Sequence, residues 1–175
     1  MNHFKILKNK DYKSFCKLNS KLGGHPDSTK LPNINFSTGS LGHGLPVSSG
    51  LAYGLMKRKN KRKIICLIGD QELMEGNTWE SLHIIRNYKI KNIIIIIDRN
   101  NSDFRSIKFI KLKKRLSVFC DKISELDGHN IKLREKAINK AILNKKSFAI
   151  IIANTIKGKG IRSIENNPEW HHKAT

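Results

Sequence analysis

Five consecutive isoleucines, within the segment Asn92–Ile97, restrict the fold of this chain more than any other feature. Apolar residues at every position favour a strand that is covered on both faces, which is the environment of a parallel sheet. Similar apolar runs occupy Lys63–Ile68 and Ser147–Ala153, and a weaker one occupies Lys122–Leu126. The sequence therefore predicts strands of one parallel sheet.

Segments with helical periodicity alternate with these strands. Helices are predicted at about Pro46–Met56, Thr78–Tyr88 and Ile131–Leu143, with a short one around Tyr12–Leu18. The alternation predicts an α/β fold, a parallel sheet flanked by helices. The length of 175 residues predicts a single domain spanning 1–175.

The predicted helix at Thr78–Tyr88 carries a start signal and a buried face. Asn77, followed three residues later by Glu80, predicts a capping box at the start of the helix. Its spacing predicts a buried stripe formed by the following residues: Trp79, Leu82, Ile84, Ile85 and Tyr88.

The net charge of +20 is typical of proteins that bind nucleic acid. The lysines, however, are spread along the whole chain, whereas a binding footprint clusters. The excess of Lys with Ile and Asn indicates a compositional bias that places most lysines on solvated faces. Nucleic-acid binding is therefore the less favoured interpretation.

The three cysteines, Cys16, Cys66 and Cys120, are widely spaced and form no C-x-x-C pair, so the sequence contains no zinc or redox motif of that kind. An odd number of unpaired thiols suits a reducing cytosol. The N-terminus has no apolar signal region, and no apolar run has the length that spans a bilayer. We expect a cytoplasmic protein without membrane contact.

Possible metal ligands follow two of the predicted strands. Asp70 comes after the strand at Lys63–Ile68, and Asn100 comes after the isoleucine run. Ligands of open parallel sheets bind beyond the carboxyl ends of the strands, and neighbouring strands lie about 4.8 Å apart. Two oxygen-bearing side chains at that separation can share one Mg²⁺, which prefers oxygen ligands. The alternative is that Asp70 only ends a strand and Asn100 forms an Asx turn.

The residues around this pair favour a bound diphosphate. Gly69 would let a phosphate approach the main chain, and the start of the following helix offers free N–H groups. The main-chain oxygen of Ser102 could add a metal ligand. The pattern G-D-x-E-L-x-E-G around Asp70 makes the metal interpretation stronger than the alternative.

Five stretches of the chain, taken in order, resemble the N-terminal, thiamine-diphosphate-binding half of transketolase, above all its split form with two separate chains. They read L-G-G-H-P-D, S-T-G-S-L-G-H-G-L, I-G-D-Q-E-L-M-E-G-N-T-W-E, I-I-D-R-N-N, and A-N-T-I-K-G-K-G with E-N-N-P-E-W-H-H-K-A. The resemblance runs from about Phe15 to the C-terminus. It implies thiamine diphosphate and Mg²⁺ as cofactors.

The resemblance also implies three catalytic histidines. His25 matches the histidine of the family's G-H-P motif, which contacts the donor sugar. His43 falls where other members have Gln or His near the cofactor. His171 matches a late histidine that assists substrate binding and proton transfer, with its neighbour His172 as a competing assignment.

Further positions correspond to contacts with the cofactor. Asp70 and Asn100 match the family's magnesium side-chain ligands, and Ser102 offers its main-chain oxygen. The remaining implied cofactor positions are Gly39 and Leu41 along the aminopyrimidine and thiazolium, Gly69 at the diphosphate, and Glu75 in a carboxylate network that links paired active sites. Ile156 is a weaker match beside the diphosphate.

The implied reaction is ketol transfer, in which a two-carbon unit passes from a ketose phosphate to an aldose phosphate. The chain departs from the family at Gln71, which replaces a glycine and would be strained if φ there were positive. The family's upstream segment is expected to be missing, and the glutamate that activates the cofactor belongs to the other half. We therefore expect a half-site that pairs with a separate pyrimidine-binding chain in a hetero-oligomer. The alternatives are a degenerate subunit that does not catalyse and, less favoured, a nucleic-acid-binding protein.

Overall fold

The computed structural model describes residues 7–31, 33–100 and 110–171. The chain divides into two compact units, residues 1–40 and 41–175. The first unit contains one short helix, α1 (Asn9–Lys13), among its described residues. The bounds predicted for it, Tyr12–Leu18, are wrong: α1 ends at Lys13, and Cys16 has a φ of 56°, which an α-helix does not accommodate.

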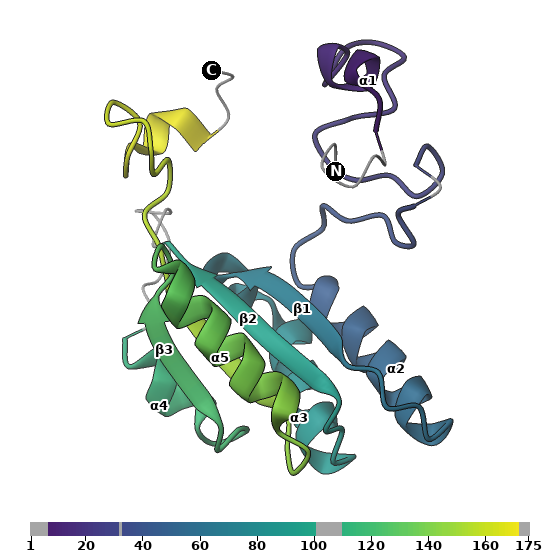
Figure 1. Ribbon diagram of the computed structural model, residues 1–175, viewed down its shortest axis with the longest axis vertical. Helices are drawn as coiled ribbons and strands as arrows, with labels where there is room; N and C mark the ends of the chain where they lie inside the picture. The colour runs from purple at the N-terminus through teal and green to yellow at the C-terminus, as the bar shows by residue number, and fades with distance from the viewer. Residues whose placement is uncertain (1–6, 32, 101–109, 172–175) are drawn as a thin grey trace. The chain divides into compact units, whose positions relative to one another are not determined.

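The second unit is built on a four-stranded parallel sheet with the order β1-β2-β4-β3 (Figure 1). Its strands are β1 (Ile64–Gly69), β2 (Ile93–Arg99), β3 (Ile123–Asp127) and β4 (Ala149–Asn154). The helices are α2 (Gly44–Lys57), η1 (Asp70–Met74), α3 (Gly76–Asn87), α4 (Leu112–Leu116), α5 (Ile131–Leu143) and η2 (Pro168–His171). The predicted α/β fold with a parallel sheet is confirmed.

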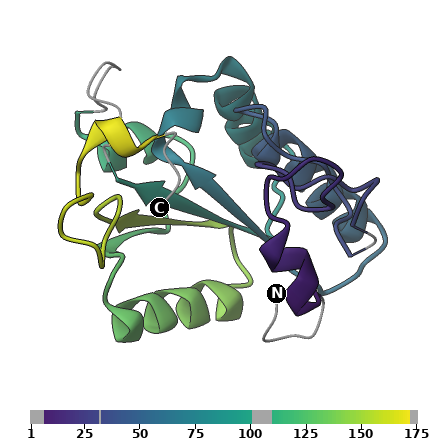
Figure 2. The same cartoon turned by 90° about the horizontal axis from the view of Figure 1, so that it is seen from above.

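The isoleucine run supplies apolar side chains to both faces of the sheet, as predicted. Ile93, Ile95 and Ile97 lie in the core that the sheet forms with α2, α3 and α4. Ile94 lies in the opposite core, beneath α5. The edge-on view in Figure 2 shows α5 on one side of the sheet and α2 with α3 on the other. Both faces of β2 are therefore occupied by apolar side chains, and the polar residues lie at the two ends of the sheet.

Coverage of the sheet is incomplete over β1. Ile65 and Leu67 point to the α5 side of the sheet and are 52% and 68% exposed. Cys66, which points to the other side, is buried, and this burial raises the pKa of its thiol. No helix among the described residues is long and apolar enough to cross a membrane.

The helix predicted at Thr78–Tyr88 begins two residues earlier, and its capping box is absent. Glu75 is the N-cap of α3, and no side chain caps that end. The Thr78 hydroxyl instead donates to the carbonyl of Glu72 at 2.6 Å. Leu82 and Ile85 are buried and Trp79 packs against the core as predicted, whereas Ile84 and Tyr88 are exposed. Ile84 and Tyr88 are exposed because they line a groove between α2 and α3.

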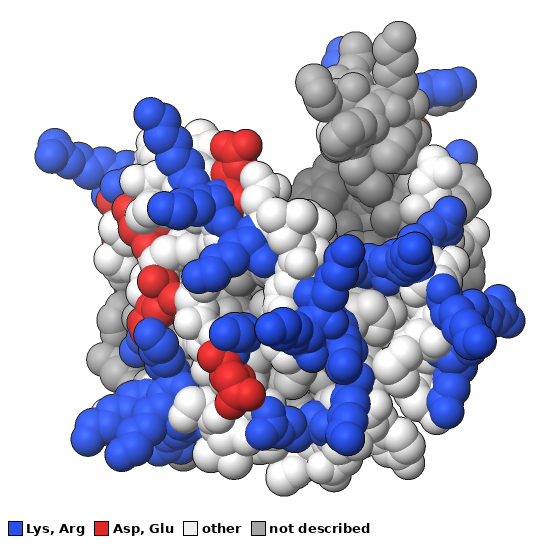
Figure 3. Space-filling model, turned by 60° about the horizontal axis from the view of Figure 1, so that its bottom comes forward, with Lys and Arg blue, Asp and Glu red and all other residues white. Residues whose placement is uncertain are grey.

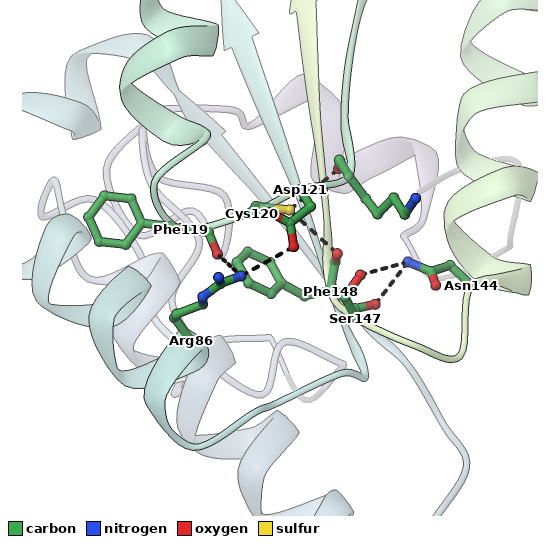
Figure 4. Close-up of polar contacts among 8 residues, drawn as sticks. Arg86, Phe119, Cys120, Asp121, Asn144, Ser147 and Phe148 are labelled. Carbon is green, nitrogen blue, oxygen red and sulfur yellow. Dashed lines mark hydrogen bonds and ion pairs between the residues drawn. The ribbon is translucent and has the colours of Figure 1, made fainter.

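The amino ends of the strands are held by a network of polar contacts around Cys120 (Figure 4). Arg86, in the last turn of α3, donates to the carbonyl of Phe119 and to the carboxylate of Asp121, both at 3.4 Å. The Cys120 thiol donates to the carbonyls of Lys122 and Phe148 at 3.5 Å. These contacts join α3 to the segments that lead into β3 and β4.

Candidate functional site

The carboxyl edge of the sheet brings together the two ends that the sequence singled out. β1 and β2 are paired in parallel, with Gly69 opposite Asp98. Asp70 directly follows Gly69 and starts η1, and Asn100 directly follows β2. The prediction that the two residues follow neighbouring strands is therefore confirmed. Asp70 is only 7% exposed, a degree of burial that a carboxylate tolerates when it is paired or bound to a cation.

Asn100 is oriented by contacts with the end of its own strand. Its amide Nδ2 donates to Oδ2 of Asp98 at 3.1 Å. Oδ1 of Asp98 accepts a hydrogen bond from the Thr155 hydroxyl, and the Thr155 N–H donates to the carbonyl of Arg99 at 3.0 Å. The nitrogen of the Asn100 amide is thus engaged with Asp98, and the oxygen is the atom whose chemistry suits a metal ion.

The main chain around Gly69 is open enough for a close ligand. A Cβ atom built on Gly69 would meet no heavy atom within 4 Å. Gln71 lies within η1, and its φ is not positive, so the strain expected at this position is absent. The Cα of Gly69 therefore leaves room for a ligand to approach the main chain.

Glu72 joins this edge to the loop that precedes α2. Its carboxylate accepts the N–H of Gly69 through Oε1 and the N–H of Gly42 through Oε2, each at 3.2 Å. Gly42 has a φ of 77°, and a Cβ there would lie 2.5 Å from Cβ of Glu75. Leu41, the preceding residue, is exposed. Glu72 thus sets the position of the Leu41–Gly42 loop relative to the end of β1.

Glu75 and His43 both lie at helix starts, Glu75 at the start of α3 and His43 at the start of α2. Glu75 is half-buried and packs against Gly42 at the start of α3. His43 is the N-cap of α2, and its Nδ1 lies 3.3 Å from the carbonyl oxygen of Leu41. It also lines a groove of about 410 Å³ between α2 and α3, whose far wall includes Glu80. An imidazole and a carboxylate therefore share one surface groove.

His25 and Gly39 lie together within the first unit. Gly39 has a φ of 140°, and a Cβ there would lie 2.8 Å from Cγ of the His25 ring. The turn after His25 is fixed by Asp27, whose Oδ1 accepts the Thr29 N–H at 2.9 Å and the Thr29 hydroxyl at 2.7 Å. These hydrogen bonds lower the pKa of the Asp27 carboxyl. Glycine at position 39 is required both by its backbone angle and by the imidazole beside it.

The remaining predicted positions are in the tail or outside the described residues. Ile156 follows β4, and its N–H donates to Nε2 of His129 at 2.8 Å. His171 ends η2. Ser102 and His172 lie outside the described residues, so their predicted roles stay predictions.

Three polar residues at this edge were missed by sequence reasoning: Glu72, Asp98 and Thr155. Glu72 stands three residues after Gly69, a spacing typical of a helix start, and that signal could have identified it. Asp98 and Thr155 are brought together only by the pairing of β2 with β4. Their contact connects residues 57 positions apart, which no local pattern indicates.

The oxygen ligands at this edge suit a hard cation whose coordination shell is completed by a bound ligand. Among residues 7–31, 33–100 and 110–171, no three His, Cys, Asp or Glu side chains gather into a metal cluster. The chain offers the carboxylate of Asp70 and the amide oxygen of Asn100. Mg²⁺ is usually held by one or two protein oxygens together with waters and phosphate oxygens, so this set fits Mg²⁺ bound with a diphosphate.

Comparisons with known proteins identify the family of this chain. Residues 3–175 match the family model described as transketolase, thiamine diphosphate binding domain. The chain is 42% identical over 162 residues to an apulose-4-phosphate transketolase subunit of Actinobacillus succinogenes, covering 89% of this chain and 58% of the relative. It is 36% identical over 163 residues to human transketolase, covering 90% of this chain and 26% of that protein.

Solved structures give the same result. Transketolase from Campylobacter jejuni superposes with a TM-score of 0.85 at 29% identity, over 91% of this chain and 27% of that one. The chain spans little more than half the length of the Actinobacillus relative and about a quarter of the full-length transketolases. The match of nearly the whole chain to one family model shows that it belongs to the transketolase family, as a thiamine diphosphate binding domain.

Proposed function

We propose that this chain is the Mg²⁺- and thiamine-diphosphate-binding subunit of an enzyme that transfers a two-carbon ketol unit between sugar phosphates. Asp70 and the Asn100 oxygen would hold the cation, with the Ser102 main-chain oxygen as a third ligand. The cation would anchor the diphosphate next to Gly69. The bound cofactor would supply the electron sink for cleavage and formation of the carbon–carbon bond.

The other predicted residues would shape the surroundings of the cofactor. Gly39 and Leu41 would line its rings, and Glu75 would belong to the carboxylate network between paired sites. His25, His43 and His171 would contact the sugar and move protons, since imidazole titrates near neutral pH. The activating glutamate would come from a separate pyrimidine-binding chain, which would complete the site.

One observation carries this proposal: the pairing of β1 with β2, which sets Asp70 and Asn100 at adjacent strand ends. The name of the Actinobacillus relative, which identifies it as one subunit of its enzyme, supports a separate partner chain. The same site supports a chain that pairs without catalysing, because Gln71 stands where the family has glycine. Binding with no ketol transfer in the assembled pair would favour this alternative.

Calorimetry tests the proposal directly. Thiamine diphosphate is titrated into the chain in Mg²⁺ and then in EDTA, with and without the subunit that pairs with the Actinobacillus relative. We expect Mg²⁺-dependent binding that is strongest when the partner is present. Absence of binding under all four conditions would contradict the proposed function. Steeply salt-dependent retention on RNA or DNA, unchanged by Asp70→Ala, would instead favour the nucleic-acid alternative.

A further inference from the structure

The turn between β3 and α5 makes an unusually close contact with the end of β4. The Gly128 N–H donates to the Asn154 carbonyl at 2.7 Å. A Cβ on Gly128 would overlap the Thr155 methyl group and lie 3.0 Å from the Asn154 oxygen. Only glycine lets the two segments come this close. The turn itself is fixed, because Oδ1 of Asp127 accepts the N–H of His129 at 2.9 Å.

His129 extends this contact by one residue. Its Nε2 accepts the N–H of Ile156 at 2.8 Å, although the imidazole is exposed. A ring nitrogen that accepts a hydrogen bond carries no proton, so the Nδ1–H tautomer of the neutral ring is required. The first residues after β4 are therefore held from one side by the turn that follows β3.

The same residues are held from the other side by the end of β2. Thr155 donates its N–H to Arg99 and its hydroxyl to Asp98, and Asp98 accepts the side-chain amide of Asn100. A continuous series of contacts thus runs from His129 through Thr155 to Asn100. Movement of the segment after β4 would be transmitted to the orientation of Asn100.

We propose that His129 is a positioning residue that, by accepting the Ile156 N–H, fixes the segment after β4 and through it the side chain of Asn100. Where it concerns cofactor binding, this inference rests on the proposed function. Thr155 and Asp98 stand between His129 and Asn100 in the series of contacts, so His129 acts on the proposed metal ligand through them.

Nuclear magnetic resonance on the cofactor-free chain tests the proposal without relying on activity. In the wild-type chain, long-range ¹H–¹⁵N spectra should show His129 protonated at Nδ1 and unprotonated at Nε2. His129→Ala should accelerate exchange of the Ile156 amide proton about three- to tenfold, the effect of losing one hydrogen bond, and should shift the Asn100 side-chain amide resonances. His129→Gln, which keeps an acceptor, should restore both signals towards wild type.

A matched control is His83→Ala, which removes an exposed histidine on α3 whose ring packs edge-on against Phe119. It should leave the Ile156 and Asn100 signals unchanged. Protonation of Nε2 in the wild-type ring, or Ile156 exchange that is the same in His129→Ala and wild type, would overturn the proposal.

Measuring cofactor binding gives a second test of the role of His129. His129→Ala should weaken Mg²⁺-dependent thiamine diphosphate binding about three- to tenfold, and His129→Gln should recover it. If the wild-type chain binds the cofactor and His129→Ala binds it equally well, the inference fails at this step. If the wild-type chain does not bind it with its partner, the proposed function fails, while the tautomer and exchange measurements still decide the role of His129.

Discussion

The two ends of the parallel sheet carry opposite chemistry. At the carboxyl edge lie the acidic side chains Asp70, Glu72, Glu75, Asp98 and Asp127, most of which accept main-chain or side-chain hydrogen bonds. The loops at the amino edge, 58–63, 88–92, 117–122 and 144–148, are rich in Lys and Arg, and Asp121 is the one acidic residue in these ranges. Figure 3, with the bottom of Figure 1 turned forward, shows many basic side chains across that face and fewer acidic ones among them.

The topology explains the difference. In a parallel sheet, the helix that leads into each strand ends at the amino edge, as α2, α3, α4 and α5 do here, and its negative dipole end favours cations there. Lysines in the loops at this edge are therefore favoured by the helix ends. Acidic groups at the carboxyl edge, where helices begin, are stabilised by the positive dipole ends, and in the proposed function they hold a cation for a diphosphate. The proposed function places the cofactor at the carboxyl edge, whereas the contacts described at the amino edge join α3 to the segments that lead into β3 and β4.

The largest expected effect is on cofactor binding, and it comes from comparing one substitution at the carboxyl edge with one at the amino edge. Asp70→Ala removes the carboxylate ligand and should weaken Mg²⁺-dependent thiamine diphosphate binding more than about 100-fold, since loss even of outer-shell partners costs 10–100-fold. Asp121→Ala removes an exposed ion pair with Arg86 and should leave binding unchanged. Calorimetry with the partner subunit gives both values. Equal binding by Asp70→Ala and wild type would remove the distinction between the edges.

A pair of glycine substitutions tests how tightly the carboxyl edge is packed. Gly128→Ala forces a methyl group against Thr155 and Asn154 and should lower the free energy of unfolding by about 2 kcal/mol. Gly54→Ala, within α2, meets no atom within 4 Å and should stabilise the chain by about 0.5–1 kcal/mol. Urea denaturation followed by circular dichroism measures both. A neutral Gly128→Ala would show that the turn after β3 does not pack tightly against Asn154 and Thr155.

Glu72 tests whether the loop before α2 is held by the carboxyl edge. Glu72→Ala removes the acceptor for the N–H groups of Gly69 and Gly42, and should weaken cofactor binding about tenfold, or about 1.4 kcal/mol. Glu72→Gln keeps one carbonyl acceptor, so its cofactor affinity should lie between those of wild type and Glu72→Ala. Glu135→Ala, an exposed change on α5, is the control and should match wild type. Identical affinity in all four proteins would mean that the loop needs no such support.

The smallest expected effect is the pH dependence of stability that comes from two buried thiols, Cys120 at the amino edge and Cys66 on β1. Burial raises the pKa of Cys120 as it does for Cys66, so both hold their protons in the folded chain. Unfolded thiols ionise near pH 8.5, so above this pH the unfolded state binds fewer protons than the folded state, and the free energy of unfolding falls as the pH rises.

Denaturation between pH 8 and 9.5 measures this slope, and Cys120→Ala should reduce it, whereas Cys16→Ser, at an exposed position, should not. Thiol reagents at pH 8 should modify Cys16 rapidly and the other two only as fast as the chain opens. Rapid modification of Cys120 would contradict the burial of its thiol.

Much of the fold could be predicted because its signals are local. The isoleucine run needs cover on both faces, and alternation with helices then leaves a parallel sheet as the remaining solution. The errors occurred where tertiary contacts override local pattern. The Asn77–Glu80 spacing predicted a capping box, but the Thr78 hydroxyl reaches back to Glu72 and Glu75 becomes the N-cap.

The site divides in the same way. Asp70 and Asn100 could be predicted because each directly follows an apolar strand. The partners that orient Asn100 could not, since Asp98 meets Thr155 only after β2 and β4 pair. The D-G-H-N sequence at 127–130 is typical of a turn, but nothing local indicates that His129 accepts the Ile156 N–H.

One measurement tests the central claim most directly: a crystal structure of the chain with its partner subunit, grown with thiamine diphosphate and with Mn²⁺ in place of Mg²⁺. The anomalous signal of manganese should give a single peak within coordination distance of the Asp70 carboxylate and the Asn100 amide oxygen, in contact with the diphosphate. A diphosphate bound without metal at this edge, or a manganese peak that Asp70 and Asn100 do not share, would contradict the account.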